Sequence, residues 1–167
     1  MIKMKSIKSI VCAVFLIPVI AYAGGMKEKP TIVGIAAGDD SFSTLVTALK
    51  AADLVSVLDG DGPFTVFAPT NEAFSKIPAD TLANLLKPEN KAQLQAVLTY
   101  HVVSGKVDAA TAMTLSEAAT VQGEKINISM NGKKVMINDA SVILADIDAR
   151  NGVIHVIDTV ILPPSVL

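Results

Sequence analysis

The sequence predicts one α+β domain in which helices come first and antiparallel strands follow. Before Ser104-Gly105, apolar residues recur with the helical period of about 3.6 residues, whereas after it they alternate with polar residues. In the second half, two Asn-Gly pairs separate apolar runs, which is a typical hairpin signal. Helices followed by locally paired strands indicate an α+β domain.

The first 23 residues have the organisation of a secretory signal peptide. Lys3, Lys5 and Lys8 precede an apolar run from Ile10 to Ile20, and a small-x-small site ends at Ala23. Because the run is shorter than the roughly 20 apolar residues that span a bilayer, we expect cleavage after Ala23 instead of a membrane anchor. The mature protein is then secreted (extracellular or periplasmic).

The mature chain is expected to lack cysteine and to carry a mild negative charge. Cys12 is the only cysteine and lies near the start of the apolar run, so we interpret it as an apolar residue of the signal, not as a lipidation site. Residues 24–167 hold 11 basic and 16 acidic side chains, a net charge of −5. This charge does not favour nucleic-acid binding, and we expect no stable membrane insertion after cleavage.

Residues 24–30 are interpreted as a flexible leader, and the domain is expected to span residues 31–167. Three apolar sets fall at helical spacing: Phe42, Leu45, Val46 and Leu49; Leu82, Leu85 and Leu86; and Leu94, Val97 and Leu98. Asp39, Asp40 and Ser41 offer N-caps to the first set. Pro78 opens the second helix and Pro88 ends it, and the third is expected from about Glu89 to Thr99.

Strands are expected from β-branched and alternating runs. The segments are Phe64–Ala68 after the turn 59–63, Ile126–Met130 and Val135–Ile137 around Asn131-Gly132, Val142–Ile147, and Val153–Ile157 after Asn151-Gly152. The last run is apolar nearly throughout, which predicts a central strand buried on both faces.

Few side chains could carry chemistry. His101 and His155 both lie in apolar runs, and we interpret them as one hydrogen-bonded core histidine and one histidine on a strand face, since zinc sites take three or four ligands. The start of a calcium loop at Asp59 fails at its fifth and sixth positions, which hold Pro63 and Phe64, so it is interpreted as a turn.

Four charged residues gather near the second Asn-Gly pair: Asp146, Asp148, Arg150 and Asp158. A carboxylate pair there could act as acid and base, although solvated strand ends are the commoner outcome. Nucleophile, zinc-protease and phosphate-loop motifs are absent from the mature sequence. We therefore expect no catalytic residue, no metal and no cofactor.

Three segments resemble the fasciclin (FAS1) domain family. Residues 64–74 (FTVFAPTNEAF) resemble its first signature box, residues 98–103 (LTYHVV) its central Tyr-His motif, and residues 151–163 (NGVIHVIDTVILP) its second box. They occur in the family's order and spacing, and the resemblance runs from about Thr31 to Leu167.

The resemblance implies a wedge with N-terminal helices beside a roughly seven-stranded antiparallel β-sandwich. It assigns structural motif roles to Thr70, Asn71, His101, Asn151, Gly152 and His155. It also implies that a polar residue of the first box is linked to a buried His101. From the residues themselves, Thr70 and Asn71 follow Pro69, where their side chains can cap the next helical turn. Tyr100 is expected as a partly exposed anchor, which makes Tyr100 and His101 possible partner-binding residues.

Three functions stay open at this point. The first is a non-catalytic, monomeric adhesion module for a cell-surface or matrix protein or polysaccharide, as the resemblance implies. The second is a carrier or sensor that holds a small apolar ligand in a seam near the leucines of residues 82–98. The third is a hydrolase that uses Asp146, Asp148 or His101.

Overall fold

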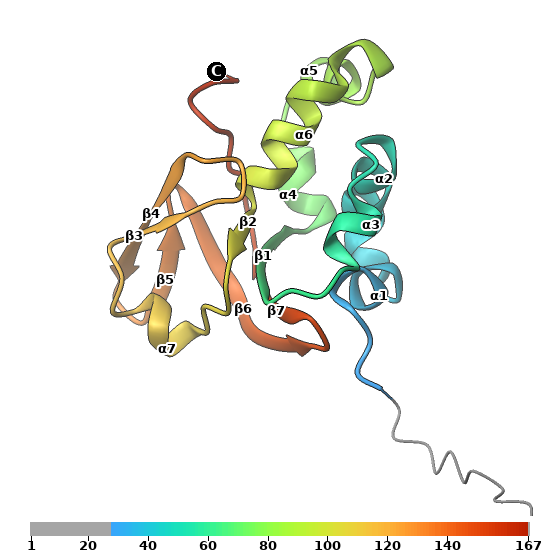
Figure 1. Cartoon of the computed structure of the whole chain (residues 1–167). Helices are drawn as coiled ribbons and strands as arrows, with labels where there is room; N and C mark the ends of the chain where they lie inside the picture. Colours follow the sequence, from blue (N-terminus) through green and yellow to red (C-terminus); the bar gives the residue numbers. More distant parts are fainter. Residues whose placement is uncertain (1–27, 167) are drawn as a thin grey trace, which may run out of the picture.

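Apart from one short helix, the helices lie on one side of the molecule and most of the strands on the other, as Figure 1 shows. The structure is a computed structural model and describes residues 28–166. The helices are α1 (Ile32–Ala37), η1 (Asp40–Phe42), α2 (Ser43–Ala51), α3 (Val55–Leu58), α4 (Asn71–Ser75), α5 (Ala79–Leu85), η2 (Pro88–Asn90), α6 (Lys91–Tyr100) and α7 (Ala109–Ala112). The strands are β1 (Phe64–Pro69), β2 (Val102–Ser104), β3 (Glu117–Ala119), β4 (Lys125–Asn131), β5 (Lys134–Ile137), β6 (Ala140–Ala149) and β7 (Gly152–Ile157).

The seven strands form one mixed sheet in the order β2-β1-β7-β6-β5-β4-β3. The predicted α+β class and the number of strands are confirmed. The expectation of a wholly antiparallel arrangement needs one correction, because β1 and β7 pair in parallel from Phe64–Gly152 to Pro69–Ile157. The long connection between them, which holds five of the helices and the other strands, makes this parallel pairing possible.

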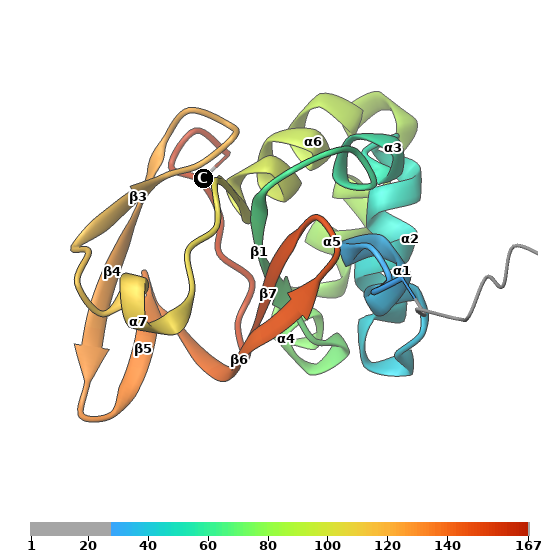
Figure 2. The ribbon, with the colours of Figure 1, turned by 60° about the horizontal axis from the view of Figure 1, so that its bottom comes forward.

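The two ends of the sheet meet. A bridge joins Val103 to Thr120, and the Val121 N–H donates to the Val102 carbonyl at 2.8 Å. This contact brings β2 to β3, so the sheet curls into a near-barrel, and Figure 2 shows β3–β5 folded away from the helices. Such closure protects strand edges that would otherwise be free to pair with another chain.

Strands β1 and β7 separate two apolar cores. Val66 and Ala68 of β1 pack with the helices, whereas Phe67 between them packs with the curled strands. Ile154 and Ile157 of β7 divide in the same way, as alternation along a strand requires. All six residues of β7 are buried, which confirms the predicted central strand.

Several short elements were not predicted. Helices α1, α3 and α7 have six, four and four residues, and β3 has three. The β4–β5 hairpin is present, but Asn131 pairs with Lys134, so the loop is Gly132-Lys133 rather than Asn131-Gly132. Gly132 at the first loop position has φ 65°, a conformation that favours glycine.

Candidate functional site

Thr70 and Asn71 join β1 to the helices. The Thr70 hydroxyl accepts a hydrogen bond from the Ala73 N–H at 3.3 Å and so caps α4. Asn71 reaches across to α2 instead of capping its own helix. Its amide donates to the Asp40 carbonyl at 2.8 Å and accepts from the Thr44 N–H at 3.1 Å. The expectation that Asn71 caps the following turn is therefore wrong, because its side chain satisfies the open start of α2.

Tyr100 is buried, with 2% of its surface exposed. Its hydroxyl donates to the Lys125 carbonyl at 3.2 Å and accepts from the Asn138 amide at 3.0 Å. These contacts tie the end of α6 to β4 and to the turn after β5. The expected role as a partly exposed anchor is wrong, and Tyr100 is unavailable to a partner in this structure.

His101 is also buried and fully hydrogen-bonded. Its Nδ1 lies 2.7 Å from the Val97 carbonyl, and its Nε2 accepts from the Ile161 N–H at 3.1 Å. Since a carbonyl only accepts, Nδ1 carries the proton of a neutral ring. Burial lowers the pKa of His101 to about 4, against a smaller opposing effect of the Val97 hydrogen bond, so the ring stays neutral at physiological pH.

His101 is linked to the first box through its backbone. The Phe67 N–H donates to the His101 carbonyl at 2.8 Å. The implied link between a polar side chain of the first box and the His101 ring is therefore wrong, because Val97 and Ile161 occupy both ring nitrogens. With no free ring nitrogen, His101 is not placed to bind a partner.

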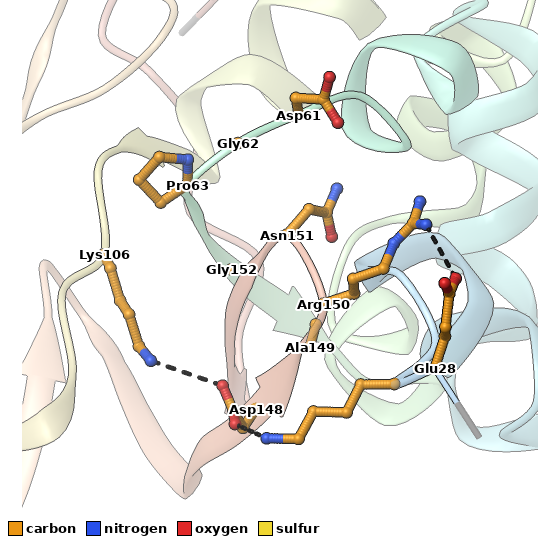
Figure 3. A pocket seen from close by; sticks show the side chains of 11 residues that line it. Glu28, Asp61, Gly62, Pro63, Lys106, Asp148, Ala149, Arg150, Asn151 and Gly152 are labelled. Atoms are coloured by element: carbon orange, nitrogen blue, oxygen red, sulfur yellow. Dashed lines mark hydrogen bonds and ion pairs between the residues drawn. The ribbon is translucent and has the colours of Figure 1, made fainter. Parts of the chain in front are cut away.

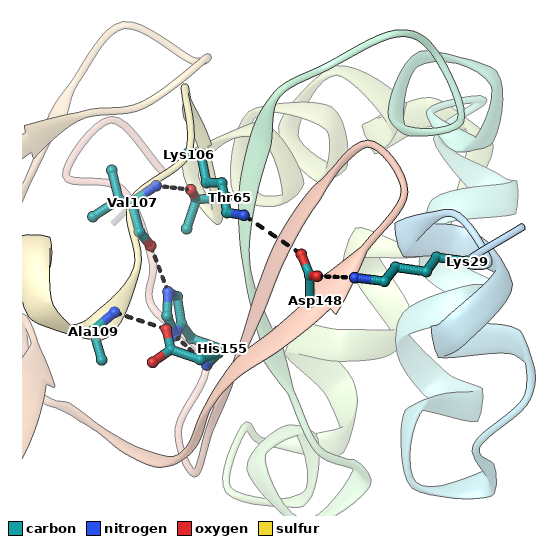
Figure 4. A network of polar contacts seen from close by, with 8 residues as sticks. Lys29, Thr65, Lys106, Val107, Ala109, Asp148 and His155 are labelled. Atoms are coloured by element: carbon teal, nitrogen blue, oxygen red, sulfur yellow. Dashed lines mark hydrogen bonds and ion pairs between the residues drawn. The ribbon is translucent and has the colours of Figure 1, made fainter.

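His155 belongs to a second polar network inside the curled strands (Figure 4). It is 2% exposed rather than on an open strand face, and it stacks on Phe67 with ring centroids 5.6 Å apart. Its Nε2 lies 2.7 Å from the Val107 carbonyl, and its Nδ1 accepts from the Asp146 N–H at 3.3 Å. The Thr65 hydroxyl accepts from the Val107 N–H at 2.8 Å and donates to the Gly105 carbonyl at 2.7 Å. Thr65 and His155 thus hold the backbone on both sides of Lys106.

Asn151 holds three segments together where β6 turns into β7. Its carbonyl oxygen accepts from the Ile32 N–H at 3.0 Å, and its amide donates to the carbonyls of Leu58 and Gly60 at 2.6 and 2.8 Å. A Cβ on Gly152 would lie 1.9 Å from the Phe64 carbonyl oxygen, which no real Cβ can do. The second Asn-Gly pair is therefore a packing junction as well as a turn.

A polar surface groove of about 770 Å³ lies over this junction (Figure 3). Its lining is polar or small: Glu28, Lys29, Asp61, Gly62, Pro63, Lys106, Asp148, Ala149, Arg150, Asn151 and Gly152. Lys29 and Lys106 both pair with Asp148, and Arg150 pairs with Glu28 at 3.4 Å. The hydrogen bond from Lys29, then the charges of both lysines, lower the pKa of Asp148 and keep it ionised.

The four charged residues of the second Asn-Gly region are not one site. Asp148 and Arg150 line the groove, whereas the Asp146 carboxylate accepts from the Ala109 N–H at 2.8 Å. Asp158 accepts from the Ser141 N–H at 3.0 Å. Across residues 28–166, no three His, Cys, Asp or Glu side chains gather as a metal-ligand set.

The seam between helices and sheet is filled by side chains. The void lined by residues of α1, α2, α6 and β1 measures about 10 Å³, which is at the limit for a single water molecule. Leu98 borders that void, while Leu82, Leu85, Leu86 and Leu94 pack in the same core. The seam thus offers no room for an apolar ligand.

Lys106 and Asn138 were not singled out from the sequence, whereas Asp61 and Thr65 were named only within the turn 59–63 and the segment 64–74. Asp61 and Lys106 meet at the groove only because β1 starts beside the end of β2 and the start of β7. Asn138 lies in the turn after β5 and has φ 52°. Asparagine tolerates this conformation, so its place directly after an alternating run is the one local signal of the turn.

Comparison with known proteins gives a consistent family. The profile of the fasciclin domain matches residues 40–163. Protein sll1483 of Synechocystis sp. is 58% identical over 134 residues, which are 80% of this chain and 74% of that protein. The cell surface glycolipoprotein MPB83 of Mycobacterium bovis is 35% identical over 146 residues, which are 84% of this chain and 64% of that protein.

The fold has a solved counterpart. The structure of a FAS1 domain pair from the insect cell adhesion molecule fasciclin I superposes with a TM-score of 0.73 at 19% identity, covering 83% of this chain and 52% of that one. Its likeness supports the fold, and the sequence matches establish the family. On these grounds, this chain belongs to the fasciclin domain family.

Proposed function

We propose that this chain is a secreted, non-catalytic adhesion domain that binds a component of the cell surface or matrix as a monomer. One observation carries the proposal. The polar side chains of the family's boxes are engaged inside the fold, while the large hollow over the Asn151-Gly152 junction is open and polar. A protein built in this way acts through its outer surface.

Two further points support export and adhesion. Residues 1–23 have the order of a signal peptide, although they lie outside the described residues. Two of the similar proteins are called a cell surface glycolipoprotein and a cell adhesion molecule. No helix among residues 28–166 is long and apolar enough to cross a bilayer.

The proposal is tested with purified protein coated on beads. We expect the beads to be retained on the surface of cells that produce the chain, and beads coated with heat-unfolded protein to be lost. A single patch of standard size buries about 800 Å² per partner, so one domain alone should hold a bead only weakly. Retention should therefore rise with the number of domains coated on each bead.

The carrier alternative gives a different result. Native mass spectrometry of protein purified from its source should show the mass of the polypeptide alone, since the seam leaves about 10 Å³. If a bound small molecule is found and the beads are not retained, the chain is a small-molecule carrier instead of an adhesion domain.

A further inference from the structure

The groove over the Asn151-Gly152 junction is charged but balanced. Three cations, Lys29, Lys106 and Arg150, face three carboxylates. The carboxylates belong to Glu28, Asp61 and Asp148, and among residues 28–166 no ion pair engages Asp61. Figure 3 shows Lys106 and Asp61 on separate walls of the groove, with Asp148 facing Lys106 and Arg150 facing Glu28. The groove therefore presents both hydrogen-bond donors and acceptors without a net charge.

The floor of the groove is fixed before any ligand arrives. Gly62 and Gly152 have no space for a side chain, because a Cβ would lie 2.1 Å from the Asn151 carbonyl and 1.9 Å from the Phe64 carbonyl. Thr65 and His155 anchor the backbone beside Lys106. A preformed site loses little conformational entropy on binding.

The lining decides which chemical class fits. Nucleic acid and sulfated chains carry dense negative charge, and a groove without net charge does not attract them as a basic groove would. Protein interfaces are usually centred on buried aromatic or apolar anchors, and the lining holds no aromatic or large aliphatic side chain. A sugar hydroxyl both donates and accepts, as side-chain hydroxyls do, and hydrogen bonds to charged groups are the stronger ones. A volume of about 770 Å³ lies within the range of small-ligand sites.

We propose that this groove binds a segment of a neutral polysaccharide, with Asp61, Lys106, Asp148 and Arg150 contacting its hydroxyl groups. This rests on the proposed adhesive function and names the partner class of that function. Because the groove is open at the surface, an extended chain can pass through it without presenting an end.

The test is a nuclear magnetic resonance titration of ¹⁵N-labelled protein with four probes. They are cellohexaose, maltohexaose, a sulfated glucan hexasaccharide and a peptide of alternating Glu and Lys. We expect at least one neutral hexasaccharide to shift the amides of Lys106, Asn151 and Gly152 saturably, and more tightly than the two charged probes. No saturable shift by either neutral probe, or a preference for the sulfated glucan or the peptide, overturns the proposal.

A matched pair of variants localises the binding. Asp61→Ala/Lys106→Ala removes one negative and one positive charge from the groove, and both residues are exposed. Glu117→Ala/Lys125→Ala removes the same charges from an exposed pair on β3 and β4. We expect the groove variant to weaken binding by about tenfold or more, since charge-assisted hydrogen bonds are lost, and the control by less than about twofold.

The same variants separate the two proposals. If groove-variant beads stay on cells as well as wild-type beads do, the groove assignment falls and adhesion stands. If wild-type beads are not retained at all, adhesion itself falls, whatever the titration shows.

Discussion

At the scale of single residues, the two histidines and Tyr100 serve the fold. Each is 2% exposed and uses its polar atoms in hydrogen bonds to backbone or amide groups, most of them in other segments. A buried polar group costs free energy unless it is hydrogen-bonded, so these residues restrict the chain to the arrangement that satisfies them. Their conspicuous positions in the sequence reflect packing.

His101→Ala should destabilise the domain. The change leaves the Ile161 N–H and the Val97 carbonyl without their partner, and the usual cost of such a buried group is about 1–3 kcal/mol. Urea unfolding measures this loss as a lower midpoint. Lys50→Ala, at an exposed position of α2, is the control and should change the free energy of unfolding by less than about 0.5 kcal/mol. An unchanged midpoint for His101→Ala would mean that the ring is exposed in solution.

Stability should also fall with acid because of His101. Its pKa is 6.5 in the unfolded reference and about 4 in the fold. Between these pH values the unfolded state binds more protons than the folded state. The contribution of the neutral His101 ring to the free energy of unfolding is therefore fully present above pH 6.5 and is lost as pH falls toward 4. The difference between the two pKa values corresponds to roughly 3 kcal/mol in the free energy of unfolding.

The comparison of wild type with His101→Asn isolates this contribution. The fold also lowers the pKa of the carboxylates of Asp39, Asp108, Asp148 and Asp158. Both proteins keep these carboxylates, so their contribution cancels in the comparison. We expect the unfolding free energies of the two proteins to converge between pH 6.5 and 4. Parallel curves would contradict a neutral, buried His101.

At the scale of elements, the sequence predicts what is long or periodic. Helices α2 and α6 have nine and ten residues, enough for an apolar face to recur, and their apolar sets are visible in the sequence. Helices of four to six residues complete too few turns to show a period, which is why α1, α3 and α7 were missed. The parallel pairing of β1 with β7 joins residues nearly 90 positions apart, and no local pattern encodes it.

For the same reason, only part of the candidate site could be predicted from the sequence. Asn151-Gly152 was recognised as a turn, and Asp148 and Arg150 were noticed beside it. Asp61 and Lys106 come from other parts of the chain and meet them only through the β1–β7 and β1–β2 pairings. The groove mixes positive and negative side chains from four segments of the chain, and no one of these segments carries a signature of it.

Gly152→Ala tests the junction of β1 and β7. The added methyl group would lie 1.9 Å from the Phe64 carbonyl oxygen, a backbone atom of the paired strand. We expect a loss of about 3 kcal/mol, as for severe overpacking, measured by thermal and urea unfolding. At Gly38 the nearest atom to the same methyl lies at 3.4 Å and φ is −87°. Gly38→Ala should therefore change stability by less than about 1 kcal/mol, and equal effects of the two variants would contradict the described register.

At the scale of the whole molecule, two filled apolar cores lie beneath the outer surface. The seam between helices and sheet has no usable void, and the sheet closes on itself through Val103 and Thr120. Neither an internal ligand nor a free strand edge is needed to explain the architecture. What the fold presents outward is the groove where the leader, the turn before β1 and the β6–β7 turn meet.

The central claim is that this chain holds cells to a surface or to one another without chemistry. The measurement is the attachment and aggregation of cells that lack the chain, before and after purified protein is added back. We expect attachment to fall without the chain, to return with wild-type protein and with Glu117→Ala/Lys125→Ala, and to stay low with Asp61→Ala/Lys106→Ala. Attachment that is unchanged when the chain is absent would contradict the account.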